Sequence, residues 1–172
     1  MTTEGIINKV SDSGLITLDL AKFLPKEVQK KTFDLKDYLF RGMILKEKDY
    51  RAALTSHDWE QYRDTYVGVY CSADAVIPLW AYMLVSSYLE AIAKDVVFGN
   101  EDAIDMLIAR KALGGINPED YQDKRVVVKG CGDASIPASA YLEITNILKP
   151  YARSIMYGEP CSTVPVFKRK RG

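Results

Sequence analysis

Short apolar blocks separated by turns run through the middle of the chain. Residues 67–70 form a brief apolar run that is typical of a buried strand, and a turn follows them. Pro78 stands where proline opens a helix, which we expect to continue to about Lys94. A second short strand, residues 96–98, stops at Gly99. The pattern therefore predicts a unit of strand, helix and strand.

The same block recurs 59 positions later. Residues 126–128 form the next predicted strand, Pro137 opens a helix that ends near residue 151, and residues 155–157 lead to Gly158. Identical residues at this spacing include the pairs Tyr62 and Tyr121, Asp64 and Asp123, and Tyr82 and Tyr141. Self-similarity at one fixed period indicates that a supersecondary unit was duplicated.

The remaining segments place these two units within one domain, residues 1–172. Residues 1–56 form an N-terminal extension, in which residues 16–20 alternate like a strand, residues 31–35 are expected to pair with them, and residues 46–54 are expected to be helical. The full division is an extension (1–56), a first repeat (59–100), a crossover with a helix over 101–113 (101–117), a second repeat (118–160) and a tail (161–172).

Two tandem repeats of this kind predict the α/β class. Right-handed crossovers most simply give a three-layer fold with one parallel sheet of order 2-1-3-4 and helices on both faces. The carboxyl ends of its strands would share one edge, where such folds bind ligands.

Composition narrows the class of function. The chain has 172 residues, 23 basic and 23 acidic side chains, and 48% hydrophobic residues. Balanced charge provides no global field for nucleic acid, and the apolar runs are far shorter than the roughly 20 residues of a membrane helix. We therefore expect a cytoplasmic protein that binds neither nucleic acid nor membrane. The basic residues 168–171 are expected to form a solvated tail, with a docking patch for an anionic partner as the alternative.

The three cysteines each follow the end of a predicted strand. In the expected sheet Cys71, Cys131 and Cys161 would lie at one edge, with Cys71 and Cys131 on the same face. Clustered thiolates in a cytoplasmic protein favour zinc or an iron–sulfur cluster. His57 is a candidate fourth ligand, although a residue at the end of a helix that contacts the last carbonyls is the alternative. Three separate buried thiols that only pack are the alternative for the whole cluster.

Asp74 and Asp133 form a second candidate site. Each lies four residues before the proline that opens a helix, where aspartate commonly makes a turn or satisfies helix N–H groups. Two carboxylates across a crevice could instead bind a cofactor or a cation, or transfer a proton. The sequence contains no nucleotide-binding motif.

Several stretches also resemble a known family. They include His57-Asp58-Trp59, the segment from Tyr70 through Cys71-Ser72-Ala73-Asp74 to Met83, Lys129-Gly130-Cys131, and Met156 to Pro165. Together they resemble the bacterial family called domain of unknown function 2480, over nearly the whole chain. The resemblance implies no activity and no site residues. Members are encoded in some cases beside iron–sulfur assembly components, which makes those components candidate partners.

Three hypotheses of function follow. The first is a metal-binding or iron–sulfur-related protein that uses the cysteines with His57 or an acidic residue. The second is a small-molecule enzyme that uses the crevice of Asp74 and Asp133. The third is a homodimeric scaffold or interaction protein without chemistry, in which the large aromatic residue Trp80 forms part of the contact.

Overall fold

The computed structural model describes residues 8–9, 14–129, 136–159 and 161–170. The chain divides into two compact units, residues 1–26 with 108–172 and residues 27–107. We call the first the terminal unit and the second the inserted unit, because the second interrupts the first in sequence. Helix α3, Glu101–Leu113, contains the boundary between them along the chain.

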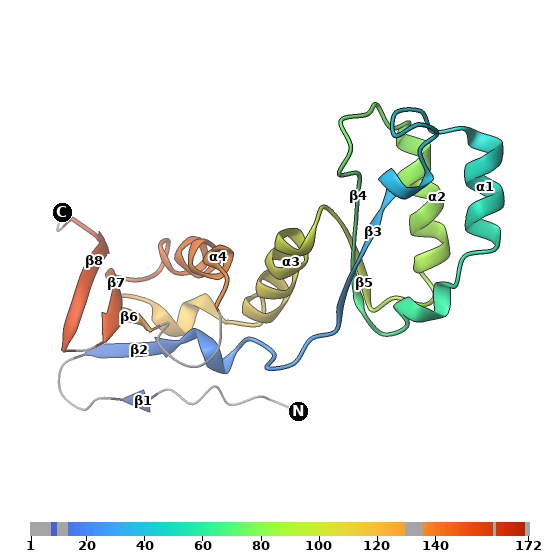
Figure 1. Ribbon diagram of the computed structural model, residues 1–172. Coiled ribbons are helices and arrows are strands. Elements are labelled where there is room, and N and C mark those ends of the chain that lie inside the picture. The colour runs from blue at the N-terminus through green and yellow to red at the C-terminus, as the bar shows by residue number, and fades with distance from the viewer. Residues whose placement is uncertain (1–7, 10–13, 130–135, 160, 171–172) are drawn as a thin grey trace. The chain divides into compact units, whose positions relative to one another are not determined.

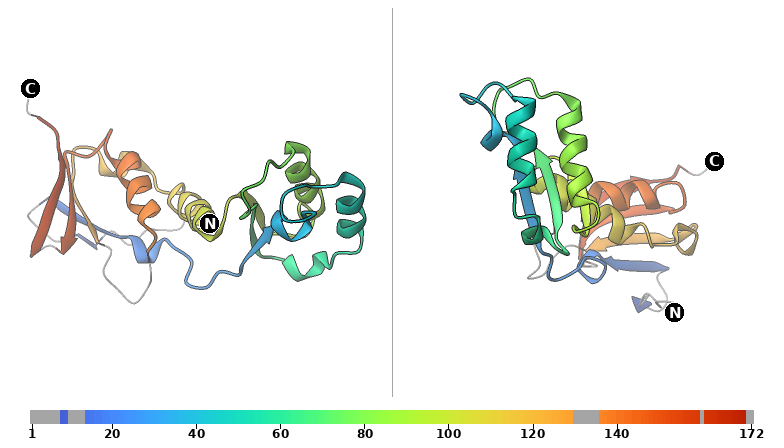
Figure 2. Two further views of the ribbon diagram at one scale, coloured as in Figure 1. Left: turned by 45° about the horizontal axis from the view of Figure 1, so that its top comes forward. Right: turned by 90° about the vertical axis from the view of Figure 1, so that its right-hand side faces the viewer.

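The inserted unit is built on a three-stranded parallel sheet of order β3-β4-β5. Helices α1 and α2 lie side by side next to this sheet (Figures 1 and 2). The bounds are β3 Lys30–Asp34, α1 Glu47–Thr55, β4 Tyr66–Tyr70, α2 Leu79–Leu89 and β5 Asp95–Phe98, with short 3-10 helices at Leu35–Tyr38 and Trp59–Tyr62.

The terminal unit has a five-stranded sheet of order β1-β2-β6-β7-β8. Its three central strands are parallel, whereas β1 and β8 pair with them antiparallel. Helix α4 lies next to this sheet (Figure 1). The bounds are β1 Asn8–Lys9, β2 Leu15–Asp19, β6 Arg125–Lys129, α4 Ala138–Leu148, β7 Ser154–Glu159 and β8 Ser162–Lys168, with 3-10 helices at Leu20–Lys22 and Pro118–Tyr121.

Each unit has its own hydrophobic core, and the two cores use residues 59 positions apart. In the inserted unit β4 contributes Val67 and Val69, and α2 contributes Ala81, Val85 and Leu89 at the four-residue spacing that places side chains on one helix face. The corresponding residues of the terminal unit are Val126, Val128, Ala140, Ile144 and Leu148. Burial of one large aliphatic side chain contributes about 1.5–3 kcal/mol.

The α/β class is confirmed, and a helix or strand lies at each predicted position, although α2 ends at Leu89 rather than near Lys94 and α4 ends at Leu148 rather than near residue 151. The predicted crossover helix matches α3, and the helix expected over residues 46–54 is α1. The single sheet of order 2-1-3-4 is wrong, because its strands lie in two sheets. The predicted pairing of residues 16–20 with 31–35 is also wrong. Strand β2 pairs with β6 and β3 pairs with β4, so the two strands of the extension complete different sheets.

The C-terminal segment differs from the tail that the sequence suggests. Residues 162–168 form β8, which pairs antiparallel with β7 along its length. Arg169 continues this pairing, since its N–H donates to the carbonyl of Arg153 at 2.9 Å. Among the described residues, no helix combines the length and apolar character needed to cross a membrane.

Candidate functional site

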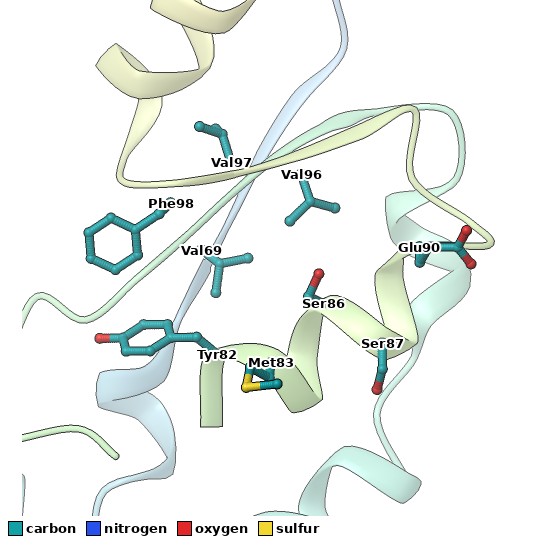
Figure 3. A pocket seen from close by; sticks show the side chains of 9 residues that line it. All are labelled: Val69, Tyr82, Met83, Ser86, Ser87, Glu90, Val96, Val97 and Phe98. Atoms are coloured by element: carbon teal, nitrogen blue, oxygen red, sulfur yellow. The ribbon is translucent and has the colours of Figure 1, made fainter. Parts of the chain in front are cut away.

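A groove on the inserted unit runs between the edge strand β5 and helix α2. Its volume is about 540 Å³. Side chains of the sheet line one side and side chains of α2 line the other (Figure 3). The lining residues are Val69, Tyr82, Met83, Ser86, Ser87, Glu90, Val96, Val97 and Phe98.

Large apolar side chains at this groove are exposed to solvent. Met83 on α2 and Phe98 on β5 are each 72% exposed. Tyr82 contacts Phe98 edge to face, with ring centroids 5.3 Å apart. Exposed apolar side chains around a concave surface are typical of a binding site rather than of an ordinary solvated face.

The backbone of β5 offers hydrogen-bonding groups at the same edge. Gly99 N–H, directly after the strand, donates to Val69 of β4 at 3.0 Å. Because successive residues of a strand direct these groups to opposite sides, Val96 and Phe98 direct theirs away from β4. Val96 N–H is instead satisfied by the Asp95 carboxylate at 2.9 Å. In the described part of the chain β5 is the last strand of its sheet, so this edge is open.

The corresponding edge in the terminal unit is occupied. Strand β7 lies 59 positions after β5, and β8 pairs with it antiparallel. Phe167 of β8 lies opposite Ile155 and packs against the hydrophobic core of that unit. The rim is also similar, because Tyr141 contacts Tyr157 edge to face at 5.6 Å, as Tyr82 contacts Phe98. In the terminal unit, β8 therefore occupies the edge of β7 that corresponds to the open edge of β5.

The carboxyl edge of the inserted sheet holds a second polar cluster. Asp34 at the end of β3 accepts hydrogen bonds from Ser72 Oγ at 2.5 Å, from Ser72 N–H at 3.0 Å and from Lys36 N–H at 3.0 Å. Partial burial opposes ionisation of Asp34, but these hydrogen bonds outweigh it and lower the pKa of the carboxyl group. The nearby Tyr82 has a raised pKa, chiefly from burial and further from the charges of Cys71 and Asp34. These bonds join the end of β3 to the loop after β4.

His57 lies in an aromatic cluster. Its ring centroid is 4.6 Å from that of Trp59 and 5.5 Å from that of Phe33. Its Nδ1 is 3.1 Å from the Tyr38 hydroxyl oxygen, and its Nε2 is 3.4 Å from Nε2 of Gln61. Burial lowers the pKa of His57, an effect that Asp58 partly offsets. Both ring nitrogens thus have protein neighbours at hydrogen-bonding distance.

The described cysteines lie in different units. Cys71 belongs to the inserted unit, is half-buried, and its thiol donates a weak hydrogen bond to the Ala73 carbonyl at 3.7 Å. Cys161 belongs to the terminal unit and is exposed. Cys131 lies outside the described residues. Among those described, no three His, Cys, Asp or Glu side chains come together in a way that could hold a metal ion. The metal site of Cys71, Cys131, Cys161 and His57 stays a prediction.

The carboxylate crevice also stays a prediction. Asp74 is exposed in the loop after β4, and Asp133 lies outside the described residues. A shared crevice requires the first strands of the two repeats to be adjacent in one sheet, but β4 and β6 belong to different sheets. Trp80, expected to pack or to form a dimer contact, packs against the core of its own unit and lies 6.1 Å from Tyr50 between ring centroids.

Sequence reasoning missed the groove and one residue of the terminal unit. The basic residues 168–171 suggest a solvated tail, yet the guanidinium of Arg169 contacts Asp123 at 3.1 Å and donates to two backbone carbonyls. A signal was present in the repeat itself. The second repeat is followed by an apolar segment, residues 162–168, whereas the first is followed directly by α3.

The fold and the groove define an α/β protein with two sheets that each have three parallel strands, in which the edge of β5 lacks the strand that pairs with β7. Residues 4–169 match the family described as "Protein of unknown function (DUF2480)", and the chain belongs to this family. The resemblance found in the sequence is thereby confirmed. No curated protein and no solved structure matches the chain.

Proposed function

We propose that this is an interaction protein that binds an extended segment of a partner protein as an added antiparallel strand on β5. The observation that carries the proposal is the position of β8 on β7, the strand that corresponds to β5. A segment that adds to a sheet edge gains affinity from main-chain hydrogen bonds and specificity from the side chains that enter the adjoining groove.

The backbone of β5 supports this mode of binding. The carbonyl groups of Val96 and Phe98 and the N–H group of Phe98 face the outer edge, and β5 contains no proline that would remove a donor. The Val96 N–H would exchange its bond to the Asp95 carboxylate for a bond to the added strand. The outermost strand of the other sheet differs, because β8 carries Pro165. Proline on an outer strand prevents further pairing. Proline therefore limits pairing at the edge of β8, whereas the edge of β5 is competent to pair.

The side chains of the groove support an apolar contact. Val96 points from β5 toward α2 (Figure 3), and Met83 and Phe98 are exposed beside it. A bound apolar side chain that covers them would contribute about 1.5–3 kcal/mol, and each new hydrogen bond about 0.5–1.5 kcal/mol. After the cost of association, a short segment is expected to bind with a dissociation constant on the order of micromolar.

A peptide with the sequence of residues 162–170, STVPVFKRK, is a suitable probe because that sequence occupies the corresponding edge of the terminal unit. Its binding to the full-length protein is measured by fluorescence anisotropy. Val96→Pro removes an N–H group that the added strand would use, together with its present bond to Asp95, without removing a bond to β4. Ser86→Trp fills the groove from α2. Lys48→Trp is the matched control, since Lys48 is also an exposed helical residue but lies on α1, outside the groove.

The proposal expects Val96→Pro and Ser86→Trp to weaken peptide binding at least tenfold and Lys48→Trp to leave it unchanged. Equal binding to all four proteins contradicts it. Concentration-dependent dimerisation that Val96→Pro abolishes and that the peptide does not compete away would also contradict it, because the occupant of β5 would then be a second copy of the chain.

A further inference from the structure

We infer that the groove selects a partner segment in which a large apolar residue is followed, two positions later, by arginine. This inference rests on the proposed function and names the chemistry of the partner. It comes from the position of Arg169 within the terminal unit. The corresponding position in the inserted unit is the end of the groove, beside the start of β5.

Arg169 makes four polar contacts in the terminal unit. One guanidinium nitrogen lies 3.1 Å from the Asp123 carboxylate, and the other donates to the carbonyls of Pro150 at 2.7 Å and Tyr151 at 3.2 Å. Its backbone N–H donates to the carbonyl of Arg153 at 2.9 Å. A carboxylate and two backbone carbonyls thus form a receptor for one guanidinium group, since arginine presents several donors in a fixed plane.

The inserted unit contains the same receptor groups. The residues 59 positions before Asp123, Pro150 and Tyr151 are Asp64, Ala91 and Ile92. Asp64 has a φ of 58° and Asp123 a φ of 56°. Asp64 N–H donates to the Ile92 carbonyl at 3.1 Å, and Asp123 N–H donates to the Tyr151 carbonyl at 3.0 Å. The backbone that positions the carboxylate is therefore equivalent in both units.

The apolar position is defined by Phe167, two residues before Arg169. Phe167 lies opposite Ile155, and its ring centroid is 5.9 Å from the Lys149 ammonium nitrogen. The corresponding residues in the inserted unit are Val96 and Glu90, and both line the groove. An apolar side chain opposite Val96 would accordingly place the residue two positions later near Asp64.

Charge at this end of the groove favours a basic segment. Glu90 stands where the terminal unit has Lys149, so Glu90 and Asp64 are both acidic. Of the basic residues nearby in sequence, Arg63 bonds to Glu60 at 2.7 Å and interacts more weakly with the charge of Asp64, and the Lys94 ammonium lies 5.1 Å from the Tyr66 ring centroid. A partner protein is favoured over the C-terminal strand of a second copy, because that strand is paired with its own β7 through six residue pairs.

The test compares two peptides on three full-length proteins. The peptides are STVPVFKRK and its variant with the arginine replaced, STVPVFKAK. The proteins are the wild type, Asp64→Asn and Asp123→Asn. Asparagine tolerates the left-handed conformation of both aspartates, so each substitution removes only the charge. Asp123→Asn is the matched control, because Asp123 already contacts Arg169 of the same chain and is not expected to contact the peptide.

The inference expects STVPVFKRK to bind the wild type three- to tenfold more tightly than STVPVFKAK, about the gain of a partly exposed charge-assisted contact. Asp64→Asn should remove this preference, Asp123→Asn should keep it, and added salt should reduce it. Less than a twofold preference on the wild type, or a preference that survives Asp64→Asn, overturns the inference. Binding of both peptides with equal affinity, lost with Val96→Pro, would overturn the inference but leave the proposed function intact. Absence of binding by either peptide would overturn both.

Discussion

Asp64 and Asp123 adopt the same left-handed backbone conformation, with φ angles of 58° and 56°. In each case the N–H group donates to a carbonyl that precedes the second strand of the repeat, at Ile92 or Tyr151. Aspartate is among the few residues other than glycine that tolerate this conformation. The shared geometry brings a carboxylate beside the start of β5 and beside the start of β7, where the two candidate arginine receptors lie.

The conformation of Asp64 predicts an unusual order of stability. Asp64→Ala is expected to be about 1 kcal/mol less stable than Asp64→Gly, because alanine has a Cβ that is strained at positive φ and both variants lack the carboxylate. The free energy of unfolding is measured in urea by tryptophan fluorescence, which reports on the inserted unit since Trp59 and Trp80 both lie there.

Asp49, an exposed residue of α1, supplies the control for this comparison. At Asp49 the order should reverse, with Ala about 1 kcal/mol more stable than Gly, because alanine is the better helix former. An alanine variant at Asp64 that is as stable as the glycine variant would contradict the left-handed conformation.

Gly68 is expected to accept no side chain. A Cβ at this position of β4 would overlap the carbonyl oxygen of Gly99, and it would lie 3.1 Å from the Asn100 carbonyl and 3.3 Å from Cδ1 of Ile104. Gly68→Ala should therefore reduce the free energy of unfolding by about 1–3 kcal/mol or more. Gly115→Ala is the control, since nothing lies within 4 Å of its added Cβ. Equal stability of the two variants would contradict the close approach of β4 to the start of α3.

His57 predicts a dependence of stability on pH. Its pKa is lowered by burial among aromatic rings, so the unfolded chain takes up a proton near pH 6.5 that the folded unit does not bind until lower pH. Stability from this group is present above pH 6.5 and decreases as the pH falls below it. His57 is the only histidine in the sequence. Between pH 7 and pH 5.5 the free energy of unfolding should decrease more in the wild type than in His57→Gln, and parallel profiles would contradict a lowered pKa.

Local patterns in the sequence predicted most elements but not their partners. The helix over residues 101–113 was predicted to the residue, because two glycines follow it directly. The sheets were not, because β2 pairs with β6 across more than a hundred residues of chain. The sequence of a short apolar strand does not indicate which strand it pairs with. The tendency of sequential strands to lie together favoured the wrong pairing.

The groove has a weaker signal in the sequence. Val96 and Phe98 resemble ordinary strand residues, and only the apolar segment 162–168, which follows the second repeat but not the first, indicates that β5 lacks a neighbouring strand. Arg169 resembles part of a solvated tail, because basic residues near a C-terminus are usually exposed to solvent. The pairing of β7 with β8 shows both that Arg169 is bound and that the edge of β5 lacks a comparable strand.

The cysteine site predicted from the sequence has a direct test. It expects protein purified under anaerobic, reducing conditions to contain stoichiometric zinc or iron, and Cys131→Ser to lose that metal. Metal content, sulfide content and the visible spectrum are measured together. The metal content of Cys71→Ser is measured for comparison. Cys71 and Cys161 belong to different units, so this variant tests whether Cys71 also binds the metal. A colourless, metal-free protein with three titrating thiols would contradict the prediction.

Arg169 tests the receptor in the unit where it is occupied. Arg169→Ala removes the contact with Asp123 and the bonds to the carbonyls of Pro150 and Tyr151, so it should lower the stability of the β7–β8 pair by about 1 kcal/mol. Hydrogen exchange of the β7 amides reports this loss, because the tryptophans lie in the inserted unit. If Arg169 acts through Asp123, the double variant with Asp123→Asn should be less destabilised than the sum of the two single variants. Additive effects, or unchanged exchange in Arg169→Ala, would mean that the carboxylate and carbonyls do not hold an arginine in solution. The inference that the β5 groove selects arginine would then lose its support, because it is based on the contacts of Arg169.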